Sequence, residues 1–280
     1  MNRNCFVSFL ILSFFPCLFY SQQRYSIEGT YKKQSAQSMA IWGDTAYLFY
    51  NSGICRALNL KTGQIVCVFK IASSGKNTHV NSASFGSEIA GYNGRPVIYL
   101  SETRKPYRCF VEQLDGTSSY IVQTLYPRYN GHPKKVTSWI VDANKKALYA
   151  LSRVNSRKQK ESDKIEITKY RLPNLLEGDS VLLSEKDVVD SFYVYFRSAL
   201  QDGVIIGDRM YISSGFHAES LRKFFSPRAV QVVDLKLKTI IRRIDLSSIF
   251  TNEPEGIDFW GGKMLLFTGQ AGGIYEVNVD

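Results

Sequence analysis

The sequence predicts an all-β protein folded as a β-propeller of five four-stranded blades, and three observations support this prediction. A polar residue followed by a short apolar run recurs five times, and each copy precedes a second β-rich run and turn residues. The copies are 44, 56, 64 and 53 residues apart, whereas a four-stranded blade needs about 40 to 50 residues. With 44% hydrophobic residues among 280, the chain can bury one large core without dividing into domains. The copies begin at Ser38, Ser82, Ser138, Asp202 and Glu255.

Each blade is expected to contain antiparallel strands, with the recurring segment innermost. The first blade is expected over 38–43, 45–50, 54–60 and 64–71. The third blade is expected over 136–142, 147–153, 164–171 and 180–183. The fourth blade is expected over 203–206, 209–213, 229–234 and 239–245. Five blades follow from the five copies, and six remain an alternative if the segment 142–200 contains another sheet.

The last blade is expected to borrow a strand from the other end of the chain. Its own segment, 256–280, contains only three strand patterns, over 257–260, 263–268 and 273–279. We expect 25–31 to supply the fourth strand, because such a closure leaves no unpaired sheet edge. Residues 22–280 are therefore predicted to form a single propeller domain.

The first 21 residues have the pattern of a secretory signal peptide. Arg3 precedes an apolar run over 5–20, and polar residues follow from Ser21. The alternatives are a single-pass anchor, for which about 20 apolar residues are needed, and lipidation at Cys17. The pattern predicts an exported protein that is periplasmic, on the cell surface or secreted.

Three cysteines follow the signal segment, which is an odd number for an exported chain. A turn over 61–64 would pair Leu58 with Cys67 and place the sulfurs of Cys55 and Cys67 on opposite faces of a hairpin. We therefore expect no disulfide between them and predict that Cys55, Cys67 and Cys109 are buried thiols between blades.

The first residues of the five copies are predicted to meet at one mouth of the central channel. Ser38, Ser82, Ser138, Asp202 and Glu255 would present only oxygen ligands there, which suit a hard cation such as Ca²⁺. The alternatives are strand capping with channel water, or a sugar or other polar ligand. The preceding residues are also polar, except in the last copy, where the residue is Pro254: they are Gln37, Asn81, Thr137 and Gln201.

Acidic residues near the same mouth raise the possibility of catalysis. In the segment 252–257, Asn-Glu-Pro-Glu-Gly-Ile, Glu253 and Glu255 would lie close together, and Gly256 permits close backbone approach at the channel. With Asp202 they would form the catalytic set of a hydrolase of glycans or phosphate esters. The sequence contains no GxSxG elbow, phosphate loop or HExxH motif, so an enzyme is the less favoured hypothesis.

Basic loops are predicted beside the mouth, because loops joining second to third strands lie on the face where inner strands begin. Two of them, 153–160 and 216–228, are long and basic. The net charge is +10, and removing Arg3 with the signal segment leaves +9, which would attract a polyanion. The alternative is that these loops are only solvated. The candidate ligand-binding residues are Gln37, His79, Asn81, Arg157, Lys158, Gln201, Arg222 and Lys223.

Two segments resemble known propellers. The segments 252–257 and 79–86, His-Val-Asn-Ser-Ala-Ser-Phe-Gly, resemble secreted TolB-like propellers of unknown function. They are more distantly similar to the propeller of teichoic-acid-locus and phage receptor-binding proteins. The ring of serine and acidic side chains resembles that of five-bladed calcium-dependent nucleotidases, whose other motifs are missing. The resemblance implies an exported propeller used for binding.

These observations predict an exported, monomeric binding or scaffold module for a polyanionic or carbohydrate ligand, a surface polymer or a protein partner. The alternative is a hydrolase that uses a channel cation or the acidic residues. Nucleic acid is not expected as a partner, because export argues against it and no recognised binding module is present. No transmembrane span is expected in the mature chain.

Overall fold

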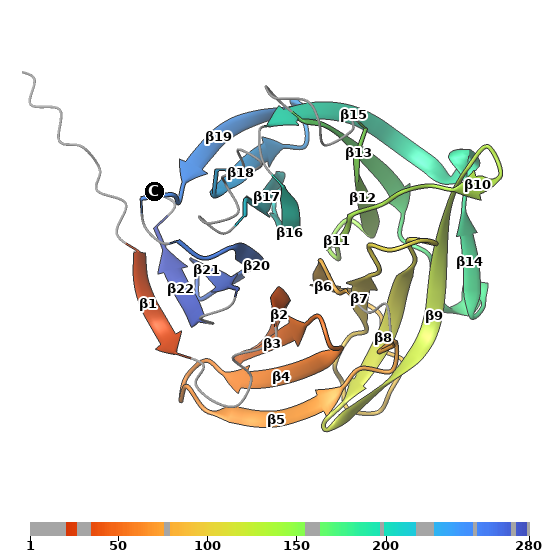
Figure 1. Cartoon of the computed structure of the whole chain (residues 1–280). Helices are drawn as coiled ribbons and strands as arrows, with labels where there is room; N and C mark the ends of the chain where they lie inside the picture. Colours follow the sequence, from red (N-terminus) through yellow and green to blue (C-terminus); the bar gives the residue numbers. More distant parts are fainter. Residues whose placement is uncertain are drawn as a thin grey trace, which may run out of the picture.

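The protein is a ring of five β-sheets around a central axis (Figure 1). The structure is a computed structural model that describes residues 35–75, 79–154, 163–196, 199–216, 227–248, 251–269 and 273–278, together with the backbone of 21–26. The helices in these residues are two single turns of 3-10 helix, η1 (Leu175–Glu177) and η2 (Glu185–Asp187), and none is long and apolar enough to span a membrane. The predicted five-bladed propeller is confirmed.

Blades one and four have the predicted four-stranded meander. Blade one consists of β2 (Ala36–Trp42), β3 (Thr45–Tyr50), β4 (Ile54–Asn59) and β5 (Ile65–Lys70) from the axis outwards. Blade four consists of β16 (Leu200–Ile206), β17 (Arg209–Ser214), β18 (Ala229–Asp234) and β19 (Thr239–Asp245). Their bounds agree closely with the predicted segments because turn residues separate the apolar strands, with glycines at positive φ at Gly43, Gly53, Gly63 and Gly207.

Blades two and three follow the same order from the axis outwards. Blade two consists of β6 (Ala83–Phe85), β7 (Ile98–Ser101), β8 (Cys109–Asp115) and β9 (Ser118–Tyr129), with a short extension, β10 (His132–Pro133). Blade three consists of β11 (Ser138–Asp142), β12 (Ala147–Arg153), β13 (Asp163–Arg171) and β15 (Val188–Phe196).

The predicted fourth strand of blade three was wrong. Residues Ser180–Leu183 do form a strand, β14, but it pairs in parallel with β9 on the outer edge of blade two. The true fourth strand is β15, whose alternating burial is typical of a strand with one buried face. Segment 172–187, which we call the strap, leaves blade three, adds β14 to blade two and returns. The segment 142–200 therefore supplies one extra strand and no sixth blade.

The last blade is closed by the N-terminal part of the chain, as predicted, but by an earlier segment. Its inner strands are β20 (Pro254–Trp260), β21 (Lys263–Thr268) and β22 (Gly273–Val277). Strand β1 (Ser21–Ser26) pairs antiparallel with β22, with Ser21 opposite Val277 and Ser26 opposite Gly273. The expected strand 25–31 overlaps β1 only at its first two residues, and 27–31 lies outside the described residues.

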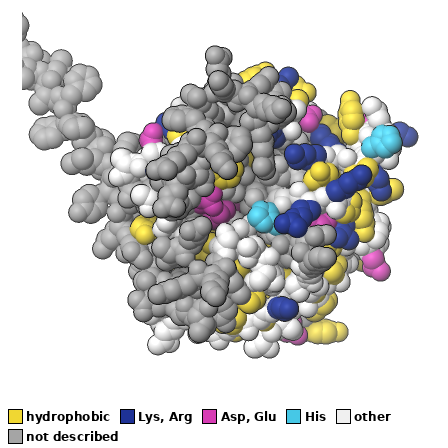
Figure 2. Space-filling view, in the orientation of Figure 1, with side chains coloured by type: hydrophobic (Ala, Val, Ile, Leu, Met, Phe, Trp, Pro, Cys, Tyr) yellow, Lys and Arg dark blue, Asp and Glu magenta, His cyan; other side chains and the backbone are white. Residues whose placement is uncertain are grey.

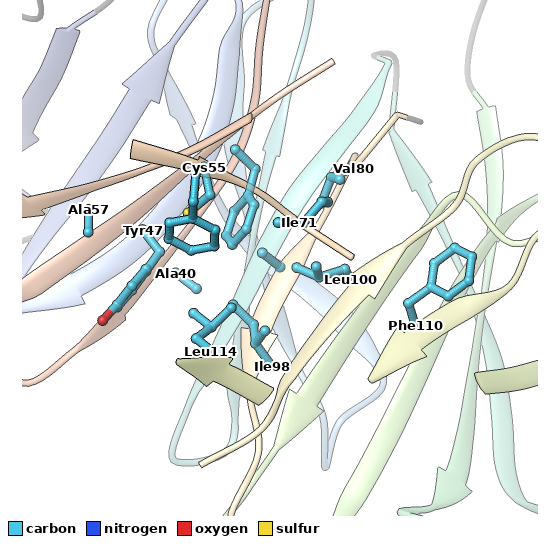
Figure 3. Packing of buried hydrophobic residues seen from close by; sticks show 13 residues of the cluster. Ala40, Tyr47, Cys55, Ala57, Ile71, Val80, Ile98, Leu100, Phe110 and Leu114 are labelled. Atoms are coloured by element: carbon cyan, nitrogen blue, oxygen red, sulfur yellow. The ribbon is translucent and has the colours of Figure 1, made fainter. Parts of the chain in front are cut away.

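The hydrophobic core is divided into five clusters, each between two neighbouring blades. Figure 3 shows the cluster between blades one and two, where Tyr47 of β3 and Leu114 of β8 pack together with residues from both sheets. The fifth cluster, which includes Leu48 of blade one and Phe267 of blade five, joins the last blade to the first. Each blade is therefore stabilised on both sides by apolar contacts, and the ring is continuous.

The predicted orientation of two cysteines was also wrong. A bulge at Ala57 and Leu58 shifts the hairpin, so that Cys67 lies opposite Ala57 and Cys55 opposite Phe69. The two cysteines consequently point to the same face and pack against the same cluster. They remain free thiols, as does Cys109. Cys55 and Cys109 are buried as expected, whereas Cys67, also predicted to be buried, is only partly buried because it lies on the outer strand β5.

Candidate functional site

A pocket of about 680 Å³ opens where the inner strands begin, at one end of the ring axis, which we call the mouth. Every blade contributes to it one polar side chain, from the first residues of the innermost strand or from just before that strand. We call these five residues the mouth ring: Gln37, Asn81, Thr137, Gln201 and Glu255. Loop residues complete its wall, and in Figure 2 acidic, basic and histidine side chains gather near the middle of the ring.

The mouth ring differs by one residue from the predicted set. Two-residue turns pair Trp42 with Thr45 in blade one and Trp260 with Lys263 in blade five. Glu255 lies five residues before Trp260, and Gln37 lies five residues before Trp42, so these two residues are equivalent. The five sequence repeats place Glu255 at the position of Ser38 instead. Gln37 and Glu255 both lie at β-bulges, which turn their side chains towards the pocket.

The other predicted oxygen ligands lie one layer further along the axis. Ser38, Ser82, Ser138 and Asp202 are buried, and none of them lines the pocket. The Ser82 hydroxyl donates to the Trp139 carbonyl at 2.9 Å and accepts from its N–H at 2.7 Å. The Ser138 hydroxyl donates to the Gln201 carbonyl at 2.6 Å. These hydroxyl groups link neighbouring inner strands.

Asp202 links three inner strands. One carboxylate oxygen accepts from Met39 N at 3.1 Å, and the other accepts from Gly203 N at 2.8 Å and Ala83 N at 3.3 Å. Burial raises the pKa of Asp202, while the three N–H groups act in the opposite direction. Both oxygens already have partners in the protein, so Asp202 is poorly placed to be a ligand or a catalytic acid.

The residues predicted to hold Ca²⁺ do not fit that ion as a set. Of the five, only Glu255 lines the pocket, and Asp202 is occupied by backbone N–H groups. Within the described parts of the chain, no group of three or more His, Cys, Asp or Glu side chains is placed to hold a metal.

Close contact between inner strands fixes the position of Glu255. A Cβ atom added to Gly256 would lie 2.6 Å from Met39 N and 2.7 Å from Met39 Cβ, so only glycine fits there. This confirms the close approach predicted for Gly256. The contact holds β20 against β2 and places Glu255 at the end of the pocket nearest the axis.

Glu253 and Glu255 lie beside each other on the pocket wall. Burial raises the pKa of Glu255 well above its usual range, and the hydrogen bond and charge of Glu253 raise it further. Nearby, burial lowers the pKa of His79, and the charge of Arg104 lowers it too, whereas the charge of Glu253 raises it.

The amide side chains of the mouth ring donate to the protein itself. Gln37 Nε2 donates to the Ala36 carbonyl at 2.7 Å, and Gln201 Nε2 donates to the Gly215 carbonyl at 3.2 Å. Asn81 Nδ2 donates to the Ser138 hydroxyl and to the backbone carbonyl of Gln201, both at 3.0 Å. These bonds fix the orientation of each amide group.

The outer wall of the pocket is basic, and we call Arg104, Lys105, Lys135 and Arg153 the cationic rim. Arg104 and Lys105 lie in the loop between β7 and β8, which the sequence analysis missed. Loops between second and third strands were predicted to reach the mouth in blades three and four. The same rule identifies this loop of blade two.

Several cations on the opposite face are paired. Lys145 and Lys236 both contact Asp208, at 2.6 and 2.5 Å, and Lys61 contacts Asp44 at 2.5 Å. Within the described residues, Lys105 and Lys135 of the rim have no such ion pair, and neither have Lys146 and Arg209 on the opposite face. The rim is therefore distinguished by its place on the pocket wall.

The structure brings together six of the predicted site residues. Gln37, His79, Asn81, Gln201, Glu253 and Glu255 all line the pocket. Arg157, Lys158, Arg222 and Lys223 lie outside the described residues. Arg153 and Phe216, which begin the two predicted basic loops, also reach the pocket wall.

No protein-family model matches this chain, and no curated protein matches its sequence. Among solved structures, it is similar to a glutaminyl cyclase of Myxococcus xanthus, with a TM-score of 0.51 and 14% identity over 92% of this chain and 94% of that one. The computationally designed Ika8 protein aligns with 92% of this chain and 100% of its own, at a TM-score of 0.42 and 12% identity. The similarity to the cyclase is one of fold. The resemblance to TolB-like propellers stays a prediction.

Proposed function

We propose that this protein is a binding module whose mouth pocket takes a polar, negatively charged ligand, such as an acidic glycan. The observation that supports this best is the cationic rim around a pocket of about 680 Å³. Charge of one sign in a concave site concentrates ligands of opposite charge. The N-terminal pattern supports a place outside the cytoplasm, where surface polymers of this kind are available.

The test compares two double variants of equal charge change. Lys105→Ala with Lys135→Ala removes two cations of the rim, whereas Lys61→Ala with Lys236→Ala removes two from the opposite face. We expect the first to weaken binding of an oligogalacturonate probe about tenfold in calorimetry at low salt, since each lost contact costs roughly 0.5 to 1 kcal/mol. The second double variant should bind like the unmodified protein. Equal losses in both would mean that only net charge matters and would contradict a site at the mouth.

A second candidate is an enzyme that uses Glu255 for general acid–base catalysis. The supporting observation is a buried carboxyl group with a raised pKa on a pocket wall, which is a common feature of active sites. A glycosidase is disfavoured, because its two carboxyl groups stand about 5 to 9.5 Å apart on either side of the scissile bond, whereas Glu253 and Glu255 lie beside each other on one wall. The glutaminyl cyclase of similar fold is itself an enzyme.

Turnover would depend on Glu255 if this second candidate were correct. A screen of phosphate, glycosyl and acyl esters with the unmodified protein should find a substrate whose hydrolysis Glu255→Gln slows at least a hundredfold. Asp44→Asn, on the opposite face, is the matched control and should leave the rate unchanged. Hydrolysis that survives Glu255→Gln would exclude this residue as the acid or base.

A further inference from the structure

We propose that the mouth ring binds a primary ammonium group, so that the ligand carries a positively charged amine at the end nearest the axis. This inference rests on the proposed function, because it describes the inner end of the same pocket. It adds a second charge of opposite sign to a ligand whose anionic group contacts the cationic rim.

The first supporting observation is a set of hydrogen-bond acceptors without donors. Gln37, Asn81 and Gln201 are only 3%, 4% and 7% exposed, and their amide N–H groups are used within the protein. No hydrogen bond reaches the side-chain oxygens Gln37 Oε1, Asn81 Oδ1 and Gln201 Oε1 within the described parts of the chain, and Gln37 Oε1 is fully buried. A buried acceptor without a donor destabilises the protein, so a ligand that supplies donors gains affinity.

The second observation is the distribution of charge along the pocket. The inner strands contribute no cation to the pocket wall in the described residues, whereas β20 contributes Glu255. Glu253, which directly precedes β20, lies beside Glu255. The four rim cations also come from segments outside the inner strands. The inner strands therefore present hydrogen-bond acceptors and a carboxyl group to the pocket, and the cations lie on the segments around them.

An ammonium group fits this inner end better than a neutral hydroxyl does. It provides three donors and no acceptor, and it carries the charge that complements a carboxylate. A sugar hydroxyl supplies one donor and brings an acceptor into a site that already has several. The matching ligand is a zwitterion whose amine and anionic group are separated by the depth of the pocket.

The experiment measures three probes by calorimetry at pH 7 with the purified protein: 6-aminohexanoate, hexanoate and hexylamine. We expect 6-aminohexanoate to bind at least tenfold more tightly than hexanoate. Glu255→Gln should abolish that preference while leaving the weak binding of hexanoate, and Asp44→Asn should preserve it. If Glu255→Gln fails to fold, Glu253→Gln provides the same test from the other side of the pair.

The outcomes separate this inference from the proposed function. Equal affinity for hexanoate and 6-aminohexanoate, lost when Lys105 and Lys135 are both replaced by Ala, would overturn the ammonium site and support the anionic one. A preference for the amine that survives both glutamine variants would place the amine elsewhere and would also overturn it. Failure of all three probes to bind at millimolar concentration would count against both proposals.

Discussion

Buried and half-buried carboxyl groups join the inner strands of this ring. Asp202 accepts from backbone N–H groups of three strands, and Asp258 does the same for two, taking Ile41 N at 2.6 Å and Phe259 N at 2.7 Å. Apolar contacts between blades are tolerant of small displacements, whereas these hydrogen bonds fix the strands in one register. The cost is that acidic side chains are buried near the axis.

Stability should therefore depend on pH through Asp258. Burial raises the pKa of Asp258 to about 7, although the hydrogen bonds from Phe259 and Ile41 lower it. An aspartate in an unfolded chain has a pKa of about 4. The folded state holds the proton more tightly, so the stabilisation is complete below about pH 4 and is lost as the pH rises towards 7.

Asp258→Asn should remove this dependence. The free energy of unfolding is measured with urea at pH 4.5, 5.5 and 7.5 for the unmodified protein and for Asp258→Asn. The difference between the two should change by at least about 1 kcal/mol across this range, because the unmodified protein loses stability as the pH rises. Asp44→Asn, a replacement at an exposed position, should retain the slope of the unmodified protein. Parallel pH profiles for the unmodified protein and Asp258→Asn would contradict the raised pKa.

At the scale of elements, the strap explains how blades two and three are held together. Gln123 of β9 donates to the carbonyls of Asn174 and Gly178 at 3.0 and 2.9 Å, which fixes the start of the strap. Strand β14 then covers the outer edge of β9, and Leu183 packs into the cluster between the two blades. The strap protects an edge that would otherwise be free to pair with another chain.

Two adjacent leucines of β14 provide a test of this role. Leu183 is 2% exposed and Leu182 is 62% exposed. We expect Leu183→Ala to destabilise the protein by about 2 to 4 kcal/mol, because it leaves a cavity between blades, and Leu182→Ala to change stability by less than about 0.5 kcal/mol. Urea unfolding of both variants measures the difference. Similar small losses would show that β14 lies on blade two without contributing to the core.

The strap also shows where prediction from sequence failed. The apolar segment 180–183 was correctly predicted as a strand, but its partner is β9, more than fifty residues away, and composition does not specify such a pairing. The nine-residue alternation of Val188–Phe196 was the better candidate for the fourth strand of blade three. Local pattern identifies strands, whereas contacts between blades decide which sheet each strand joins.

At the scale of the whole molecule, the five repeats were sufficient to predict the ring and most of the mouth. They identified the five inner strands and the polar residues that precede them, because repetition places equivalent residues around one axis. They did not reveal the bulge that places Glu255 in the mouth ring. A bulge changes the register by one residue without a distinctive residue type, so only the pairing of strands shows it.

The pairing of β1 with β22 has a consequence for the order in which the ring forms. Ser21 lies opposite Val277, so the two partners of this pairing are separated by nearly the whole chain, whereas the strands within blades one, four and most of five follow one another directly. Joining distant segments loses more chain entropy than joining neighbours. Blades can thus assemble successively from local hairpins, and the closing strand is expected to dock last. A circular permutant would link the ends near residues 21 and 278 and open the exposed turn at 61–63. In this permutant β1 and β22 would form a local hairpin, and the slow, long-range closure would move to blade one.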